Sequence, residues 1–147
     1  MKIFRCSQTD IDYAFEAVYF VKYEDEEVRP SVNKKDIELF LKNTDNHFYV
    51  AIINDKAAGF LIAYELQRID RNSKMMFFYE IGVLKEFRCN GVGTTLINLL
   101  KNYCIENGFM KMFVPTNRSN IPAMGLYEKT GGQESDHCDE VFFTWHF

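Results

Sequence analysis

The residues best suited to chemistry form a strand-like segment followed by a glycine-bearing loop. Residues 78–83 read FYEIGV and residues 88–93 read RCNGVG, directly before a segment with helical periodicity. A strand that runs through such a loop into a helix directs backbone N–H groups toward the helix N-terminus, where the helix dipole also favours anions. Glycine is needed there because a side chain would keep phosphate oxygens at a distance. The pattern predicts a phosphate site, with an ordinary strand-to-helix turn as its alternative.

Two other kinds of nucleotide-binding loop do not fit this segment. A Walker loop requires Gly-Lys-Ser or Gly-Lys-Thr after four intervening residues, and the sequence contains neither triplet. A dinucleotide fingerprint requires a third glycine three residues after Gly93, where the sequence has Leu96. Neither of these nucleotide sites is therefore predicted.

A second pattern begins at Asn120, 27 residues beyond Gly93, where residues 120–131 read NIPAMGLYEKTG. Together the two patterns resemble the GNAT superfamily of acyl-CoA-dependent N-acetyltransferases. The acetyl-CoA motif of that family reads Arg/Gln-x-x-Gly-x-Gly/Ala and is completed downstream by Asn-x-x-Ala-x-x-Leu-Tyr-x-x-x-Gly. Every fixed position of both is met here, in the right order. The most similar branch is that of the aminoglycoside 3-N-acetyltransferases, on four short segments: 63–66, 79–80, 96–101 and 122–123.

The resemblance implies acetyl-CoA as the co-substrate and no metal. Main-chain groups of residues 81–83 would hold the pantetheine arm, and one of their N–H groups would polarise the thioester carbonyl. Backbone amides of residues 89–94 would hold the pyrophosphate, and Asn120 would hydrogen-bond the cofactor. The implied cofactor-binding residues are Ile81, Gly82, Val83, Arg88, Cys89, Asn90, Gly91, Val92, Gly93, Thr94 and Asn120.

Two residues are implied to act in catalysis. Tyr127 would protonate the departing thiolate, and its alternative role is to pack a helix on the sheet. Glu80 would share a strand face with Met76 and Phe78, where partial desolvation would suit it to act as a base for an incoming ammonium. Glu80 could instead orient a cationic substrate or sit paired in the sheet. Direct attack by the amine is expected, without an acyl-enzyme and without a nucleophilic cysteine.

Departures from the family pattern fall where substrates bind. Many relatives have Arg at the position of Cys89, so an electrostatic contribution to phosphate binding is lost here. The aminoglycoside branch has two acidic residues before the proline, where this chain has Asn120 and Ile121. The resemblance implies acetyl transfer to a primary amine of a small cationic acceptor, such as an aminoglycoside or a polyamine. A protein or peptide N-terminal or lysine acetyltransferase and a non-catalytic acyl-CoA-binding module are the alternatives.

The charge distribution bears on possible partners. The chain has 17 Lys and Arg against 21 Asp and Glu, a formal net charge of −4, with acidic clusters at 24–27 and 134–140. Such clusters are most often solvated loops, but they could also attract a cationic small molecule or basic peptide. A basic footprint for nucleic acid is absent, so no nucleic-acid partner is expected. The segment 137–139 (HCD) has no second ligand pair at a helpful spacing, so no metal site is expected.

Cysteine placement and hydropathy indicate the cellular setting. The four cysteines lie far apart in the sequence without a Cys-x-x-Cys pair, which favours reduced thiols over a disulfide framework or a zinc ribbon. No apolar run approaches the ~20 residues that span a bilayer, and residues 1–10 contain no apolar leader segment. A cytoplasmic protein without a membrane partner is therefore expected, and the resemblance allows a homodimer because many relatives form one.

The elements that must position these residues are expected to form a single mixed α/β domain over residues 1–147. With 47% hydrophobic residues, the chain is long enough to bury one core. Helical periodicity predicts helices capped by Thr9 and by Asn33, and two more at about 92–107 and 120–129. Strands are predicted at 2–5, 48–53, 57–66, 75–83, 110–114 and 140–147.

The strand at 75–83 is apolar on both faces, which predicts a central place in the sheet. The resemblance implies a central mixed sheet of about six to seven strands, flanked by about four helices.

Overall fold

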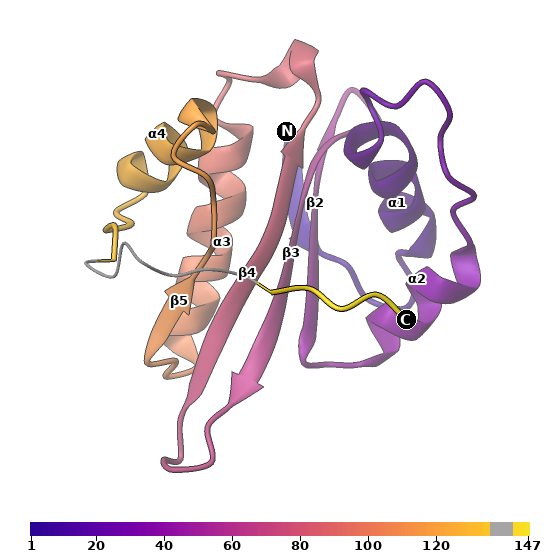
Figure 1. Ribbon diagram of the computed structural model, residues 1–147. Coiled ribbons are helices and arrows are strands. Elements are labelled where there is room, and N and C mark those ends of the chain that lie inside the picture. Colours follow the sequence, from indigo (N-terminus) through magenta and orange to yellow (C-terminus); the bar gives the residue numbers. More distant parts are fainter. Residues whose placement is uncertain (136–142) are drawn as a thin grey trace.

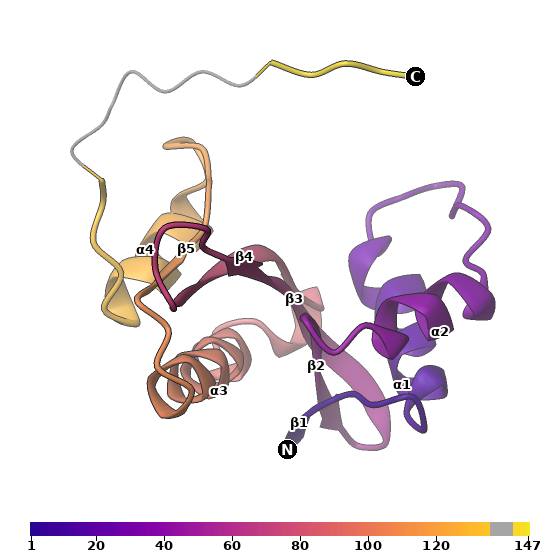
Figure 2. The ribbon, with the colours of Figure 1, turned by 90° about the horizontal axis from the view of Figure 1, so that it is seen from below.

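The computed structural model describes residues 1–135 and 143–147. Helices α1 and α2 cover one face of a twisted sheet, and helices α3 and α4 cover the other (Figures 1 and 2). In chain order the elements are β1 (Lys2–Arg5), α1 (Ile11–Glu16), the π-helical turn η1 (Ala17–Lys22), α2 (Lys34–Lys42), β2 (Asn46–Ile53), β3 (Lys56–Gln67), β4 (Lys74–Val83), the 3-10 turn η2 (Lys85–Phe87), α3 (Val92–Glu106), β5 (Lys111–Phe113) and α4 (Ile121–Lys129).

The sheet has the strand order β1-β2-β3-β4-β5, with antiparallel pairs throughout except for the parallel pair β4–β5. These are five strands in the described part of the chain, fewer than the six to seven expected. The last predicted strand begins at 140–142, outside the described residues, and residues 143–147 belong to no strand. The mixed α/β class with four α-helices is confirmed.

The central strand is β3, whereas the sequence predicted β4 for that place. The reason lies in the composition of β4. Met76 and Phe78 are fully buried on one face, but Phe77 and Tyr79 belong to a row of aromatic rings on the other face, and Tyr79 is 52% exposed. A strand can therefore be apolar on both faces without being covered on both.

Turn residues and helix caps in the sequence predict where several of the elements begin and end. The hairpin between β2 and β3 turns at Asn54 and Asp55, both with positive φ, as a tight two-residue hairpin turn requires. Asn33 caps α2 with its side-chain oxygen, 2.9 Å from the backbone N of Lys35. The predicted cap at Thr9 is wrong: α1 begins after Asp10, whose carboxylate is bound instead by Ser7.

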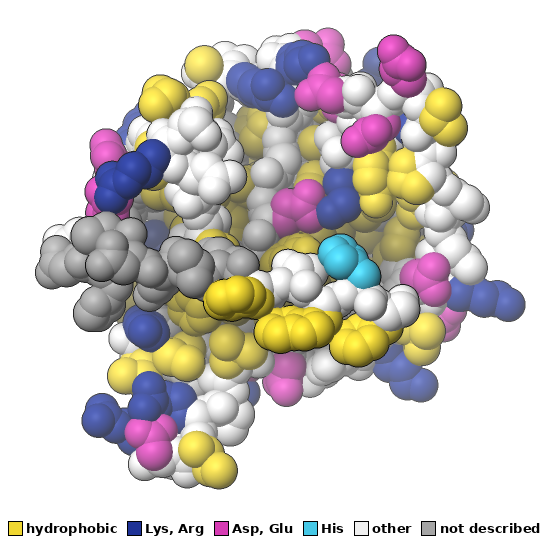
Figure 3. Space-filling model, viewed as in Figure 1, with side chains coloured by type: hydrophobic (Ala, Val, Ile, Leu, Met, Phe, Trp, Pro, Cys, Tyr) yellow, Lys and Arg dark blue, Asp and Glu magenta, His cyan; other side chains and the backbone are white. Residues whose placement is uncertain are grey.

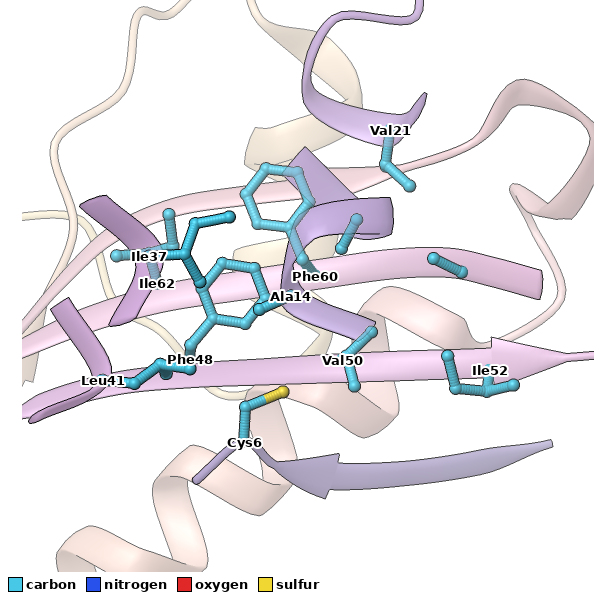
Figure 4. Packing of buried hydrophobic residues seen from close by; sticks show 12 residues of the cluster. Cys6, Ala14, Val21, Ile37, Leu41, Phe48, Val50, Ile52, Phe60 and Ile62 are labelled. Carbon is cyan, nitrogen blue, oxygen red and sulfur yellow. The ribbon is translucent and has the colours of Figure 1, made fainter. Parts of the chain in front are cut away.

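Two hydrophobic clusters lie on the two faces of the sheet, because successive strand residues point to opposite faces. On the first face, α1, η1 and α2 pack on β2 and β3, with Phe48, Phe60 and Ile62 at the centre (Figure 4). On the second face, the apolar stripe of α3 packs on buried Phe78 and its neighbours. Residues of β4 belong to the second cluster, and the rings of Phe77 and Tyr79 meet Tyr64, which packs on the first.

A buried polar network lies at the C-terminal end of α3. His47 is fully buried, with Nε2 2.8 Å from Oε1 of Glu65. The Tyr103 hydroxyl donates to the same oxygen at 2.8 Å, and the Lys74 ammonium donates to Oε2 at 2.6 Å. Burial raises the pKa of Glu65, but these three hydrogen bonds outweigh it, so that pKa lies below its usual value. Nδ1 of His47 has no partner among the described residues.

Acidification is expected to destabilise the protein through His47. Burial lowers its pKa, despite the hydrogen bond to Glu65, whereas an unfolded chain has the ordinary value of about 6.5. The unfolded state therefore binds more protons below pH 6.5, and the free energy of unfolding falls with pH by at most about 1.4 kcal/mol per pH unit. Urea midpoints at pH 7.5 and 5.5 test this for the wild type and His47→Gln. The exposed His146 supplies the control His146→Gln, which should keep the full pH dependence; an equal dependence in His47→Gln would exclude His47 as its source.

Candidate functional site

The edge of β4 that faces β5 is largely unpaired. The two strands pair only from Met75↔Lys111 to Phe77↔Phe113, and beyond Phe77 no described strand continues along that edge of β4 (Figure 1). Such an edge presents backbone N–H and C=O groups to any extended ligand that lies beside it. The described part of the chain thus leaves room for a ligand along the second half of β4.

Backbone alternation shows which residues face this open edge. The Leu84 N–H donates to the Ala58 carbonyl on β3 at 2.9 Å. Because backbone groups alternate in direction along a strand, Gly82 also turns toward β3, whereas Ile81 and Val83 turn toward the open edge. Three residues are predicted to hold a pantetheine arm. Two of them, Ile81 and Val83, direct backbone groups toward the open edge. Gly82 has another role, because a Cβ there would lie 2.5 Å from the ring of Phe60.

The loop before α3 leaves backbone donors free. Gly91 precedes the helix in the left-handed region, with φ of 81°, and no side chain caps the helix. The first helical hydrogen bond runs from the Thr95 N–H to the Gly91 carbonyl, at 2.9 Å. The N–H groups of Val92, Gly93 and Thr94 therefore have no intrahelical acceptor. A Cβ at Gly91 would meet no atom within 4 Å, so the space beside this 15-residue helix is open to an anion.

The second glycine of the loop serves packing. A Cβ at Gly93 would lie 3.0 Å from the Leu126 side chain, so glycine lets α3 and α4 come close together. Asn120 begins α4, and its side-chain oxygen accepts from the Ala123 N–H at 3.3 Å. Its Nδ2 group makes no hydrogen bond with a described residue and is left for a ligand. The loop and α4 thus meet where Gly93 faces Leu126.

Arg88, which leads the loop, is engaged by the chain itself. Its Nε donates to the Val83 carbonyl at 2.8 Å, and its Nη2 lies 3.3 Å from Oε2 of Glu24. The Glu24 carboxylate also accepts from the Lys85 N–H at 3.0 Å, and the Lys85 ammonium pairs with Asp25. Two carboxylates of the acidic cluster at 24–27 are therefore neutralised beside the loop, rather than free to attract a cationic partner.

Tyr127 lies on α4 against β4. Its ring meets that of Phe78 edge to face, with centroids 5.6 Å apart. Burial raises the pKa of the Tyr127 hydroxyl, which makes no hydrogen bond within the described residues. The ring borders a cleft of about 630 Å³ between β5 and α4, which Lys101 and Gly131 also line. Tyr127 packs against the same cluster as Ile81 and Val83, on the α3 face of the sheet.

Glu80 lies on the opposite face from the one predicted. Glu80 pairs with Ile62 and Phe78 with Ala63, so Tyr79 is an extra residue, a β-bulge. The bulge breaks the alternation and turns Glu80 to the face of Ile62, which α1 and η1 cover. There its carboxylate forms an ion pair with Lys22, the last residue of η1. The predicted common face with Met76 and Phe78 is therefore wrong.

Lys22 is a partner of Glu80 that the sequence did not reveal. A single lysine near the end of an amphipathic helix carries no recognisable motif. Its position depends on two irregularities, the π-helical turn η1 and the bulge at Tyr79, neither of which has a sequence signal of this kind. π-helical turns are rare and often occur at functional sites.

Cys89 is expected to be the most reactive of the three thiols that the structure describes. It is exposed beside the free donors of α3, whereas Cys6 and Cys104 are buried. Burial raises the pKa of Cys6 to about 12 and that of Cys104 to about 11. In a Cys138→Ser background, iodoacetamide at pH 8 should alkylate Cys89 at least about 100-fold faster than either, as measured by mass spectrometry.

Acetyl-CoA should slow the alkylation of Cys89 at saturation, because the phosphates would cover the loop. Pantothenate, which lacks the pyrophosphate, should not. Equal rates for Cys89 with and without acetyl-CoA would argue against a ligand at this loop.

Known proteins are similar to this chain in sequence over much of its length. A family model, described as the Acetyltransferase (GNAT) family, matches residues 10–132. A curated relative, N-alpha-acetyltransferase 50 of Danio rerio, is 31% identical over 85 residues, which are 56% of this chain and 48% of the relative. The chain spans about half the length of the curated relatives it matches.

Solved structures share the fold over nearly the full chain. An aminoglycoside acetyltransferase from an uncultured soil metagenomic sample, in complex with sisomicin, superposes with a TM-score of 0.87 at 18% identity, covering 99% of this chain and 96% of the other. AAC(6')-Iy, in complex with the bisubstrate analog CoA-S-monomethyl-acetylneamine, gives a TM-score of 0.77 at 20% identity, covering 99% and 97%. At these sequence identities the structural similarity shows a common fold and nothing more.

Proposed function

We propose that this chain, which belongs to the Acetyltransferase (GNAT) family, is an acetyl-CoA-dependent N-acetyltransferase acting on a primary amine. The observation that carries the proposal is the pairing of two backbone surfaces, in which the Val83 carbonyl already accepts from Arg88 and the other groups named here have no partner in the described chain. The N–H groups of residues 92–94 point from the start of α3, and Ile81 and Val83 face the open edge of β4. One set suits a pyrophosphate and the other an extended amide-bearing arm, which are successive parts of the same cofactor.

The residues present fit this cofactor without a metal. Bound acetyl-CoA would supply an activated acetyl thioester. The Ile81 and Val83 backbone would hold the pantetheine arm as an added strand, and a free N–H of this edge would stabilise the carbonyl oxygen as negative charge develops. Val92, Gly93 and Thr94 would donate to the pyrophosphate. Among the described residues, no three potential metal-ligating side chains come together.

Tyr127 is proposed to donate a proton to the sulfur of the departing thiolate. Its raised pKa keeps the hydroxyl protonated at neutral pH, and the hydroxyl has no competing partner in the described chain. The amine must lose a proton as the new C–N bond forms and the C–S bond breaks. We assign the acceptance of that proton to Glu80, directly or through water, from the opposite face of β4.

For the acceptor we propose a small cationic amine. A carboxylate near the open edge of β4 favours an ammonium, and structural neighbours include aminoglycoside acetyltransferases, one in complex with sisomicin. The second candidate is a peptide or protein N-terminus, favoured by the relative N-alpha-acetyltransferase 50.

The deciding experiment is an acetyl-CoA turnover assay that follows release of free thiol. The panel contains sisomicin, spermidine and peptides with free and with blocked N-termini. If the acceptor is a small cationic amine, sisomicin or spermidine should give the highest kcat/KM. A preference for the free peptide N-terminus would select the second candidate. Acetyl-CoA binding by calorimetry without thiol release from any amine would identify a non-catalytic acyl-CoA-binding module.

A further inference from the structure

The ion pair between Lys22 and Glu80 occupies the acceptor side of β4. Lys22, which supplies the ammonium, is the last residue of η1, and η1 packs on β3 and β4. Both side chains are partly exposed, 27% for Lys22 and 29% for Glu80, so solvent and solutes can reach the pair. In Figure 3 the front of the molecule is hollowed between its two helical halves, and acidic and basic side chains lie next to each other within the hollow. The pair is therefore accessible from solvent.

Aromatic rings lie on the same face of the sheet as the pair, and the Lys22 ammonium also lies 5.9 Å from the ring centroid of Tyr23. The rings of Tyr64 and Tyr79 meet edge to face at 5.6 Å, and Phe77 lies 5.7 Å from Tyr79 and 6.3 Å from Tyr64. Burial raises the pKa of Tyr64, the neighbouring Tyr79 hydroxyl and Glu80 carboxylate raise it further, and the Lys22 ammonium lowers it. These groups therefore act on one another. Ring faces attract cations, most strongly where water is partly excluded.

This part of the sheet face thus combines one carboxylate with several aromatic rings, which is the chemistry that recognises an organic ammonium. An ammonium already pairs with this carboxylate, and it belongs to Lys22. A partly exposed ion pair of this kind adds little to stability, because solvent screens it and both side chains lose freedom. Lysine can also keep its apolar stem packed while its head moves into water. Exchange of this ammonium for another is therefore easy.

We propose that Lys22 is an internal competitor for the acceptor amine and thereby a specificity-determining residue. Its ammonium occupies the place at Glu80 that a primary ammonium of the acceptor takes, beside the rings of Tyr64 and Tyr79. An acceptor displaces it only if its own ammonium binds Glu80 better, so weakly binding cations are rejected. This inference rests on the proposed function in naming the ligand as the acceptor.

The test compares Lys22→Met with Lys22→Arg. Methionine keeps the packed stem and removes the charge, whereas arginine keeps the cation. With the best cationic amine of the turnover panel, Lys22→Met should lower KM about threefold to tenfold and change kcat little, because competition for Glu80 ends. Lys22→Arg should retain the KM of the wild type. KM in Lys22→Met should also rise more steeply with salt, since the carboxylate then attracts the acceptor unopposed.

A binding measurement separates this inference from the activity. Ligand-observed NMR with benzyltrimethylammonium, which cannot be acetylated, should show several-fold tighter binding to Lys22→Met than to the wild type. Benzyl alcohol, the neutral control, should bind both equally. In the Glu80→Gln background, Lys22→Met should give no gain, because Lys22 acts through that carboxylate.

Unchanged or weaker binding of benzyltrimethylammonium to folded Lys22→Met would overturn the inference, as would an equal gain in the Glu80→Gln background. Failure of the wild type to turn over acetyl-CoA with any amine would overturn the proposed function instead. The cation-binding comparison would still decide the role of Lys22.

Discussion

Substitution of Tyr127 by Phe is expected to lower kcat about 100-fold or more, because a positioned general acid contributes roughly 10²–10⁴ to the rate. The affinity for acetyl-CoA should stay near that of the wild type. Phenylalanine retains the edge-to-face contact with Phe78, and the hydroxyl that it lacks has no hydrogen bond to lose in the described structure. Single-turnover kinetics should show the same loss, which excludes slow product release as the cause.

The pH dependence of this variant gives a second measurement. A proton donor works only while protonated, so the rate falls as pH rises through its pKa. Burial raises the pKa of Tyr127 above its ordinary value of about 10, which places this basic limb above pH 10. Tyr127→Phe should lose the limb, whereas Tyr13→Phe, an exposed control, should keep it. A kcat near that of the wild type in Tyr127→Phe would assign the residue to helix packing alone.

Much of the fold could be predicted because its signals are local. The caps, turns and apolar periodicities of single elements depend on neighbours a few residues away, as Asn33 and the Asn54-Asp55 turn show. The same holds for the loop before α3, where glycines and a following helix imply free backbone donors. Gly82 illustrates the limit of such reasoning, since its close partner is Phe60 on the neighbouring strand.

The acceptor side could not be predicted in this way, because it depends on irregular backbone. Regular alternation puts Glu80 beside Phe78, but one extra residue at Tyr79 moves it to the other face. The partner Lys22 becomes adjacent only through that bulge and the π-helical turn. For the acidic cluster at 24–27 the sequence likewise predicted a solvated loop or a surface that attracts cations, and only the fold places Glu24 beside Arg88.

Gly91→Asp is expected to weaken acetyl-CoA binding well over tenfold, whereas Tyr127→Phe leaves that affinity nearly unchanged. Two causes act together. Gly91 has a φ of 81°, which strains any residue with a Cβ, and the new carboxylate would lie beside the free N–H groups of residues 92–94. That carboxylate would accept these hydrogen bonds itself and repel the pyrophosphate. Calorimetry with acetyl-CoA at low and high salt measures both the loss and its electrostatic share, which should shrink as salt rises.

Two control variants separate the causes. Gly91→Asn has nearly the same size and backbone strain without the charge, so its loss of affinity should be smaller and less dependent on salt. Gly108→Asp adds the same side chain in an open left-handed position, with φ of 69°, just beyond the other end of α3. It should cost similar stability and leave the affinity for acetyl-CoA unchanged. If Gly91→Asp folds as well as Gly108→Asp and still binds acetyl-CoA like the wild type, the pyrophosphate does not lie at the N-terminus of α3, and the free donors there require another ligand.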